Sequence, residues 1–135
     1  MQTVTTSHPI IDVSLGKMVI ATQPCRRGDT IAVIYGTIRE TPTYQTIQIG
    51  NRKHLMCNGD ARFLNHSCSP NTEISIVNDV IYLIASIDIY EGTELTFDYE
   101  TTEERLAVPF TCQCKSFMCR GYISGYDKKS DNPDR

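Results

Sequence analysis

The residues with the clearest chemical potential are three cysteines near the C-terminus. Cys112, Cys114 and Cys119 form a C-x-C-x4-C pattern. The two cysteines of a C-x-C pair are poorly placed to bond each other, because disulfide geometry is demanding, whereas three thiolates on one loop can share a metal ion. A structural zinc site takes four ligands, so one more is needed, and the candidates are Cys25, Cys57, Cys68 and the histidines. The alternative is a loop of reduced cysteines without a metal.

A second chemical segment lies in the middle of the chain, at residues 62–71, which read R-F-L-N-H-S-C-S-P-N. It places an amide, an imidazole and a thiol, those of Asn65, His66 and Cys68, within four residues of one another. No helical or strand periodicity calls for this mixture, so it indicates a site. The alternative is a polar turn whose side chains satisfy their own backbone.

The elements that must position these residues are mostly short strands. Runs rich in Val and Ile or alternating in polarity predict strands at 17–22, 30–38, 44–49, 74–76, 80–84 and 94–99. Asn78-Asp79 lies between two of them and predicts a hairpin turn. Helix signals are scarce, and the best covers 101–107, with a threonine cap, acidic residues in the first turn and Pro109 after it. The sequence alone therefore predicts a mainly β domain.

The composition limits the classes of function. The chain has 135 residues, which fits one domain, and a net charge of −3, which argues against a nucleic-acid binder with a broad basic face. No run approaches the roughly 18 apolar residues of a membrane span, and the first residues lack the features of a secretory signal peptide. We therefore expect an intracellular protein with no membrane segment and no direct nucleic-acid contact, whose cysteines are reduced or metal-bound.

Three segments, taken together, resemble the SET-domain family of protein lysine methyltransferases. They are residues 62–71, residues 91–99 (E-G-T-E-L-T-F-D-Y) and residues 110–121 (F-T-C-Q-C-K-S-F-M-C-R-G), with weaker matches at 15–21 and 28–31. The resemblance implies a mainly β fold of the β-clip type, in which small curved sheets surround a pseudoknot formed by the first two segments. It also implies a SET domain over 10–108 and a post-SET zinc loop over 109–123. Residues 124–135 are predicted to form a disordered tail.

The resemblance also implies a ligand set for the metal. In family members with a post-SET loop, the cysteine of the N-H-S-C segment completes the zinc site. This makes Cys68 the partner of Cys112, Cys114 and Cys119 around one structural Zn²⁺. Cys25 and Cys57 are then ordinary small apolar residues.

The activity that the resemblance implies is methyl transfer from S-adenosylmethionine to a lysine of a protein or peptide, histone or non-histone. Tyr99 is the expected catalytic residue. The expected cofactor-binding residues are Asn65, His66, Gly16, Lys17, Met18, Arg62 and Phe117, and Phe97 and Tyr35 are expected to line the substrate channel. Phenylalanine at position 97, where the family has either Phe or Tyr, implies room for di- and trimethylation. Core packing is the alternative for Tyr35, and an exposed loop aromatic is the alternative for Phe117.

Two other functional classes compete with an active enzyme. Met18 replaces the second glycine of the family's G-x-G motif, where a glycine allows close backbone approach to the cofactor. A degenerate SET module that binds peptide or cofactor without turnover is therefore the main alternative. A small zinc-stapled interaction module is a third hypothesis, but it leaves the E-L-T-F-D-Y segment unexplained.

Overall fold

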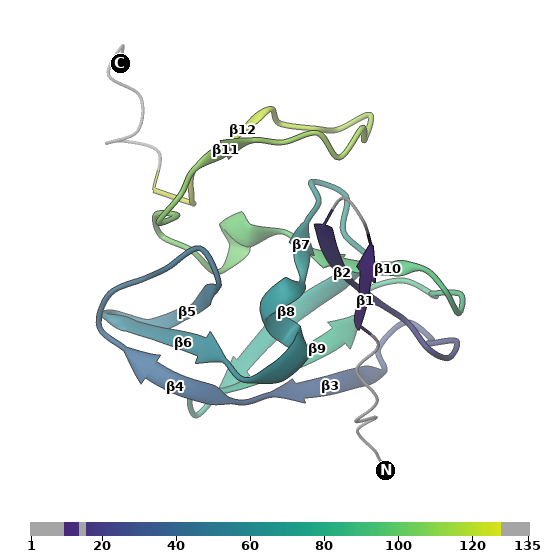
Figure 1. Ribbon diagram of the computed structural model, residues 1–135, viewed down its shortest axis with the longest axis horizontal. Helices are drawn as coiled ribbons and strands as arrows, with labels where there is room; N and C mark the ends of the chain where they lie inside the picture. Colours follow the sequence, from purple (N-terminus) through teal and green to yellow (C-terminus); the bar gives the residue numbers. More distant parts are fainter. Residues whose placement is uncertain (1–9, 14–15, 128–135) are drawn as a thin grey trace.

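The computed structural model describes residues 10–13 and 16–127 of the chain. Within them, short strands form four small sheets, and helical structure is limited to two 3₁₀ helices, η1 (Gly59–Phe63) and η2 (Tyr99–Thr101). Figure 1 shows the sheets packed around a shared interior, with β11 and β12 above them. The mainly β fold of small sheets predicted from the sequence is confirmed. Among the described residues, no helix has the length and apolar character needed to cross a membrane.

The sheet that carries most of the expected site residues has the strand order β1-β2-β10-β7. Its strands are β1 (Ile10–Val13), β2 (Gly16–Ile20), β7 (Asn65–His66) and β10 (Glu94–Phe97). β10 is antiparallel to β2 but parallel to β7, with Thr96 opposite Asn65 and Phe97 opposite His66. Two segments far apart in the chain are thus direct neighbours, as the expected knot requires.

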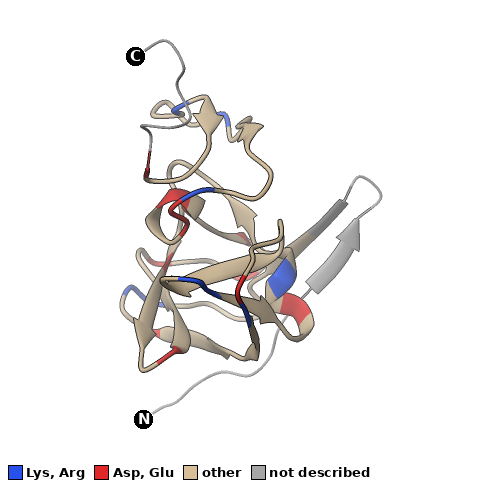
Figure 2. Ribbon diagram, turned by 90° about the vertical axis from the view of Figure 1, so that its left-hand side faces the viewer, with Lys and Arg blue, Asp and Glu red and all other residues tan. Residues whose placement is uncertain are grey.

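The remaining sheets are smaller. One has the order β3-β9-β8, from β3 (Thr30–Ile34), β8 (Thr72–Val77) and β9 (Val80–Ala85). Another has the order β4-β6-β5, from β4 (Gly36–Arg39), β5 (Thr46–Gly50) and β6 (Lys53–Cys57). A two-stranded sheet joins β11 (Phe110–Thr111) to β12 (Tyr122–Ile123). Figure 2 shows this C-terminal pair as a separate layer over the body, and acidic and basic residues are interspersed along the ribbon in this view.

The core lies where the first three sheets meet. Alternate residues of β9 and β10 are buried, as expected for strands that cover an interior with one face. The buried cluster includes Val19, Ile31, Ile34, Ile47, Leu55, Leu64, Ile81, Leu83, Leu95 and Phe97. Cys25 and Cys57 belong to this cluster, which agrees with their expected role as small apolar residues.

The hairpin predicted around Asn78-Asp79 is confirmed as β8–β9. Asn78 and Asp79 have φ values of 52° and 64°, the left-handed conformation that a two-residue type I′ turn requires. The pairing runs from Val77 opposite Val80 to Thr72 opposite Ala85. This regular pairing brings the two ends of the hairpin close to each other. One end follows β7 in the chain, and the other precedes β10.

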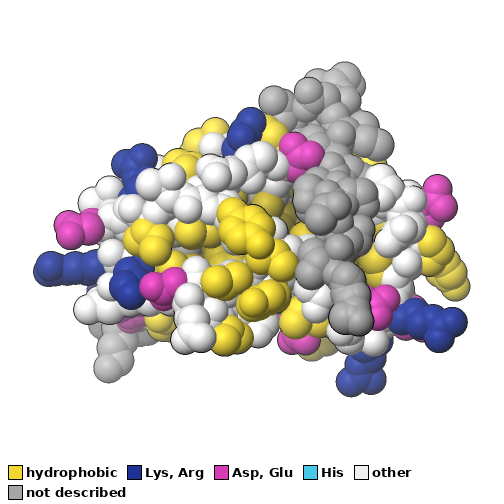
Figure 3. All heavy atoms as spheres, turned by 90° about the horizontal axis from the view of Figure 1, so that it is seen from below, with side chains coloured by type: hydrophobic (Ala, Val, Ile, Leu, Met, Phe, Trp, Pro, Cys, Tyr) yellow, Lys and Arg dark blue, Asp and Glu magenta, His cyan; other side chains and the backbone are white. Residues whose placement is uncertain are grey.

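The single strand predicted over 30–38 is two strands, and the chain changes sheet at Tyr35. β3 pairs with β9 whereas β4 pairs with β6. Gly36 allows the change, because a Cβ there would lie 1.9 Å from the carbonyl oxygen of Met56. Figure 3 views the molecule from the side of β3 and β4 in Figure 1 and shows hydrophobic side chains gathered on this face.

The helix predicted over 101–107 is wrong beyond its first residue. The Asp98 carboxylate accepts a hydrogen bond from the Glu100 N–H at 3.0 Å, which caps the short η2. The N–H groups of Thr102 and Glu103 still donate to the Tyr99 carbonyl, but beyond them the chain finds partners elsewhere in the fold. The Leu106 N–H donates to the Ser124 carbonyl at 2.8 Å, for example, so tertiary contacts replace the helical hydrogen bonds.

The disordered tail predicted from residue 124 is wrong for residues 124–127. The N–H groups of Ser124 and Gly125 donate to one carboxylate oxygen of Glu100 at 2.9 and 3.0 Å. The N–H of Tyr126 donates to the Glu103 carbonyl at 2.9 Å. Polar composition alone misses these residues because their partners are distant in the sequence. Residues 128–135 lie outside the described part of the chain.

Candidate functional site

A cavity of about 360 Å³ lies beside Tyr99 and is the centre of the candidate site. The Phe97 ring, 4% exposed, lies 5.0 Å from the Tyr99 ring between centroids. The Tyr99 hydroxyl donates a hydrogen bond to the Leu64 carbonyl at 2.5 Å. The other lining residues are Thr43, Tyr44, Gln45, Thr46, Ile47, Ala61, Arg62, Glu103, Leu106, Ala107, Val108 and Phe110. The walls are thus mostly apolar, which suits the hydrocarbon part of a ligand.

Tyr99 is held as a neutral phenol. Burial raises its pKa above the ordinary tyrosine value, and the nearby carboxylates of Glu103 and Glu94 raise it further. The proton therefore stays on the hydroxyl at neutral pH and points to Leu64. The phenol oxygen keeps lone pairs available for a donor in the cavity.

His66 connects Tyr99 to a cysteine. Its Nδ1 accepts a hydrogen bond from the Tyr99 backbone N–H at 3.0 Å, so the ring proton is on Nε2, which lies 3.4 Å from the Cys68 sulfur. Burial lowers the pKa of His66, while the charge of Asp98 opposes this shift. A neutral ring that donates to Cys68 follows from these contacts. The family resemblance implied only a cofactor-binding role for this residue.

The remaining segments expected at the cofactor lie in the same sheet. Asn65 donates from its side-chain amide to the Glu94 carboxylate at 2.7 Å. β2, which contains Gly16, Lys17 and Met18, pairs with β10 next to Glu94. The structure therefore brings Asn65, His66 and β2 to one sheet. The Met18 side chain is half-buried.

Asn71 holds the two motif segments together. Its amide donates to the Glu94 carbonyl at 2.8 Å, and its side-chain oxygen accepts from the Thr96 N–H at 2.9 Å. The Thr72 hydroxyl donates to the Thr96 carbonyl at 2.7 Å. These side-chain hydrogen bonds continue the contact between the two motif segments beyond the end of β7.

Not every expected site residue lies at this cavity. Arg62 lines it, and its guanidinium carbon lies 4.7 Å from the centre of the Phe63 ring. Tyr35 does not line it, and its expected channel role stays a prediction. Tyr35 is 66% exposed and borders a separate pocket of about 240 Å³ next to β3 and η1, because the chain turns outward between two sheets there. Phe117 is fully exposed and is not brought to the site.

Sequence reasoning missed most of the residues that line the cavity, among them Phe110 and Glu103. The Phe110 ring packs edge-on against His66 and Tyr99, at centroid distances of 5.7 and 6.0 Å. Its position just before Cys112 was the available signal. Glu103 is 5% exposed, and its place in an expected helix concealed its burial.

The four expected cysteine ligands form a cluster. The sulfurs of Cys68, Cys112, Cys114 and Cys119 all lie within 4.8 Å of one another, and those of Cys68 and Cys112 are 3.9 Å apart. In a tetrahedral zinc site with Zn–S bonds of about 2.3 Å, sulfurs are separated by about 3.8 Å. The residues therefore fit a four-coordinate metal ion.

The surroundings of the sulfurs fit bound thiolates. The Arg120 N–H donates to the Cys68 sulfur and the Cys114 N–H to the Cys112 sulfur, both at 3.3 Å. Without a cation, burial raises the pKa of Cys112 to about 12. Hydrogen bonding from the Cys68 backbone lowers the pKa of Cys114 to about 6. A metal ion would displace the remaining protons and offset part of the negative charge of the thiolates.

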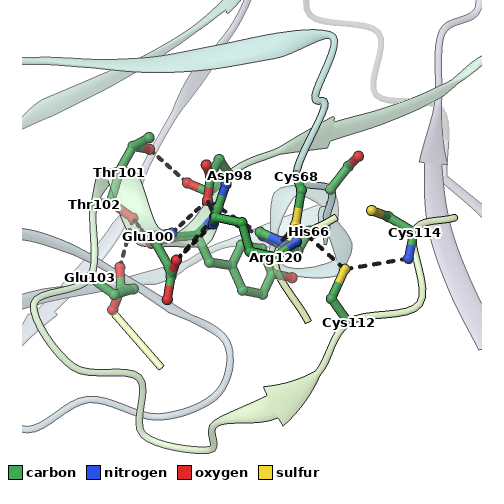
Figure 4. A network of polar contacts seen from close by, with 12 residues as sticks. His66, Cys68, Asp98, Glu100, Thr101, Thr102, Glu103, Cys112, Cys114 and Arg120 are labelled. Atoms are coloured by element: carbon green, nitrogen blue, oxygen red, sulfur yellow. Dashed lines mark hydrogen bonds and ion pairs between the residues drawn. The ribbon is translucent and has the colours of Figure 1, made fainter. Parts of the chain in front are cut away.

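Arg120 ties the cysteine loop to the cavity segment, as Figure 4 shows. Its guanidinium lies 2.7 Å from the Asp98 carboxylate and 3.0 Å from that of Glu100. Asp98 directly precedes Tyr99. The C-terminal loop is thus attached to the knot by an ionic contact and by the cysteine cluster, side by side.

Comparisons of the sequence and the structure with known proteins identify related proteins. The "SET domain" family model matches residues 16–100. Methyltransferase flvH of Aspergillus flavus is 35% identical over 83 residues, which cover 62% of this chain and 47% of that protein. The histone-lysine N-methyltransferase ASHH2 of Arabidopsis thaliana is 34% identical over 122 residues, covering 74% of this chain and 7% of that protein.

A further relative and a solved structure extend the comparison. The H3 lysine-4 specific histone-lysine N-methyltransferase of Schizosaccharomyces pombe is 43% identical over 68 residues, covering 47% of this chain and 7% of that protein. The crystal structure of KRYPTONITE with mCHH DNA, an H3(1-15) peptide and SAH superposes with a TM-score of 0.72 and 21% identity, covering 90% of this chain and 30% of that chain. The chain spans less than half the length of each of these proteins. By its matched model, its motifs and its fold, the chain belongs to the SET-domain family.

Proposed function

We propose that this protein is an S-adenosylmethionine-dependent protein-lysine N-methyltransferase that acts on an intracellular protein substrate. The observation that carries the proposal is the mostly apolar cavity at Tyr99, with the N-H-S-C and E-L-T-F-D-Y segments side by side. Relatives named as histone-lysine N-methyltransferases support the reaction. The H3(1-15) peptide and SAH in the KRYPTONITE complex support the classes of substrate and cofactor.

The cavity has the properties that methyl transfer to an amine requires. S-adenosylmethionine would supply an activated methyl group, and the lysine amine must be neutral and aligned to attack it. Apolar walls such as Phe97 and Leu64 favour the neutral amine by excluding water. The neutral Tyr99 hydroxyl offers a lone pair that orients the amine N–H. Phe97 offers no hydrogen bond to a water beside the amine, which leaves room for di- and trimethylation.

The proposed cofactor contacts come from the sheet that joins β2, β10 and β7. Asn65 would hold the amino-acid end of the cofactor, and the His66 backbone would lie at the adenine. Gly16, Lys17 and Met18 would border it from β2, with Arg62 nearby. Phe117 would cover the adenine only if its exposed loop turned inward.

The metal ion at Cys68, Cys112, Cys114 and Cys119 is proposed to be structural Zn²⁺. Four thiolates form a closed tetrahedral site with no open position for a substrate, which is typical of structural zinc. The ion would fix the C-terminal strands β11 and β12 over the cavity, where Phe110 contributes to the wall.

A module that binds cofactor or peptide without turnover is a second candidate. Met18 is half-buried in β2, where the family has a glycine, and Phe117 is fully exposed. Both features favour a weaker cofactor site. The intact environment of Tyr99 favours the enzyme instead.

Transfer of a radiolabelled methyl group from S-adenosylmethionine to mixed histones and cell lysate tests the proposal. Tyr99→Phe should lower label incorporation by about 100-fold or more, because it removes a preorganised polar group from the site. Tyr90→Phe is the matched control, since Tyr90 is 84% exposed in a turn. Mass spectrometry of the product gives the degree of methylation. Cofactor binding without label on any substrate would support the binding module and refute the enzyme.

A further inference from the structure

Glu103 is a buried carboxylate that faces the cavity. It is 5% exposed and lines the same cavity as Tyr99 and Phe97. It comes from the irregular segment after η2, and Figure 4 shows it below Thr102, on the side of that segment away from the cysteines. Buried carboxylates are rare unless they are paired, so this residue needs a reason.

The contacts of Glu103 are hydrogen bonds from neutral groups. One carboxylate oxygen accepts from the Gln48 N–H at 2.7 Å and from the Thr102 hydroxyl at 2.9 Å. These bonds fix the orientation of the side chain. They do not neutralise its charge, because both donors are uncharged.

No basic side chain in the described part of the chain forms an ion pair with Glu103. Arg62 lines the same cavity, but its guanidinium lies over the Phe63 ring, at 4.7 Å from the ring centre. Burial raises the pKa of Glu103, and the two hydrogen bonds only oppose this shift. The fold therefore holds a negative group at a mostly apolar cavity without a cation of its own, an arrangement typical of functional sites.

We propose that Glu103 is the residue that selects a cationic side chain for this cavity, by pairing with the ammonium group of the incoming lysine. The inference rests on the proposed function and names the group that recognises the substrate. The apolar walls accept the four methylenes of lysine as readily as those of a neutral isostere, so the carboxylate supplies the discrimination. Because the pairing stabilises the charged amine, it contributes to binding and not to the transfer step.

Binding measured without turnover tests the proposal. Nα-acetyl-lysine methylamide and its neutral isostere Nα-acetyl-norleucine methylamide are titrated into the ¹⁵N-labelled protein. Chemical-shift changes of the Tyr99 and Phe110 amides report occupancy of the cavity. The wild type should bind the lysine derivative about 10- to 100-fold more tightly than the norleucine derivative. Glu103→Gln, which keeps an acceptor for Gln48 and Thr102, should abolish this preference. Glu104→Gln is the matched control because Glu104 is exposed, and it should retain the preference.

Kinetics and thermal melting separate this role from a structural one. If a methylated substrate is found, Glu103→Gln should raise KM about 10- to 100-fold with kcat unchanged or higher. Its melting temperature should be equal to or above that of the wild type, because a buried charge is removed. A lysine preference that persists in Glu103→Gln overturns the inference even if the enzyme is active. Selective lysine binding by a protein that transfers no methyl group would overturn the proposed function and leave the inference standing.

Discussion

At the scale of single residues, the site combines positions that the sequence marks with positions that it conceals. Asn65, His66 and Tyr99 lie in motifs rich in functional residue types, so the sequence could mark them as candidate site residues. Glu103 and Phe110 reach the cavity only through tertiary packing. An acidic residue near a threonine cap is also what an exposed helix would contain, and no local pattern distinguishes the two cases.

The raised pKa of Glu103 predicts a pH dependence of stability. A group that binds its proton more tightly in the folded state stabilises the fold at low pH, and this contribution is lost as pH rises through the raised pKa. Glu103→Gln has no such titration. We expect the free energy of unfolding of the wild type, relative to this variant, to fall as pH rises from the ordinary glutamate pKa of about 4.3 through the raised value.

Urea denaturation of both proteins at a series of pH values provides the measurement. Two titratable groups, Tyr99 and Cys57, interact with Glu103. Both have raised pKa values, that of Cys57 to about 12, so both stay neutral in this range. A difference in unfolding free energy that is constant with pH would show that Glu103 titrates as an exposed carboxyl does.

At the scale of elements, strand positions were predicted better than strand partners. The turn at Asn78-Asp79 could be placed because its residues favour one backbone geometry. The break at Tyr35 could not, since both halves are rich in β-forming residues and only their pairing separates them. β6 was missed because Lys53–Cys57 has no β-branched residue; it is held between β4 and β5.

The pairing of β10 with the N-H-S-C segment depends on Asn71. Asn71→Ala removes two hydrogen bonds and leaves backbone groups of Glu94 and Thr96 without those partners, so we expect a loss of about 2–4 kcal/mol of unfolding free energy. Asn58→Ala serves as the control, because Asn58 is exposed and its side chain makes no capping bond; its effect should be within about 0.5 kcal/mol. Chemical denaturation measures both. Equal effects would rule out the bracing role.

At the scale of the whole molecule, the cysteine cluster and the cavity share one chain segment. Cys68 belongs to the metal cluster, while His66 bonds to both Cys68 and Tyr99. Removal of the metal with a chelator should therefore lower the melting temperature, the cofactor affinity and any methyl transfer together. Arg120 should keep part of the C-terminal loop attached through Asp98, so the loss of affinity should be partial.

Metal analysis, calorimetry with S-adenosylmethionine and the transfer assay check this coupling, with added Zn²⁺ expected to restore the protein. Roughly one zinc ion per chain is expected, and Cys68→Ser should lower the zinc content. A metal-free protein with unchanged turnover would show that the two sites are independent.

The parallel pairing of β7 with β10 has a consequence for the kinetics of folding. A parallel pair between distant segments must wait for the intervening chain to close, and such non-local contacts slow folding. Here the intervening chain includes the β8–β9 hairpin, whose ends at Thr72 and Ala85 meet. Early formation of this hairpin would shorten the effective loop and make the pairing faster. We expect Asn78→Ala to slow refolding more than it speeds unfolding in stopped-flow experiments, so that a turn outside the candidate site determines how quickly the cavity at Tyr99 is assembled.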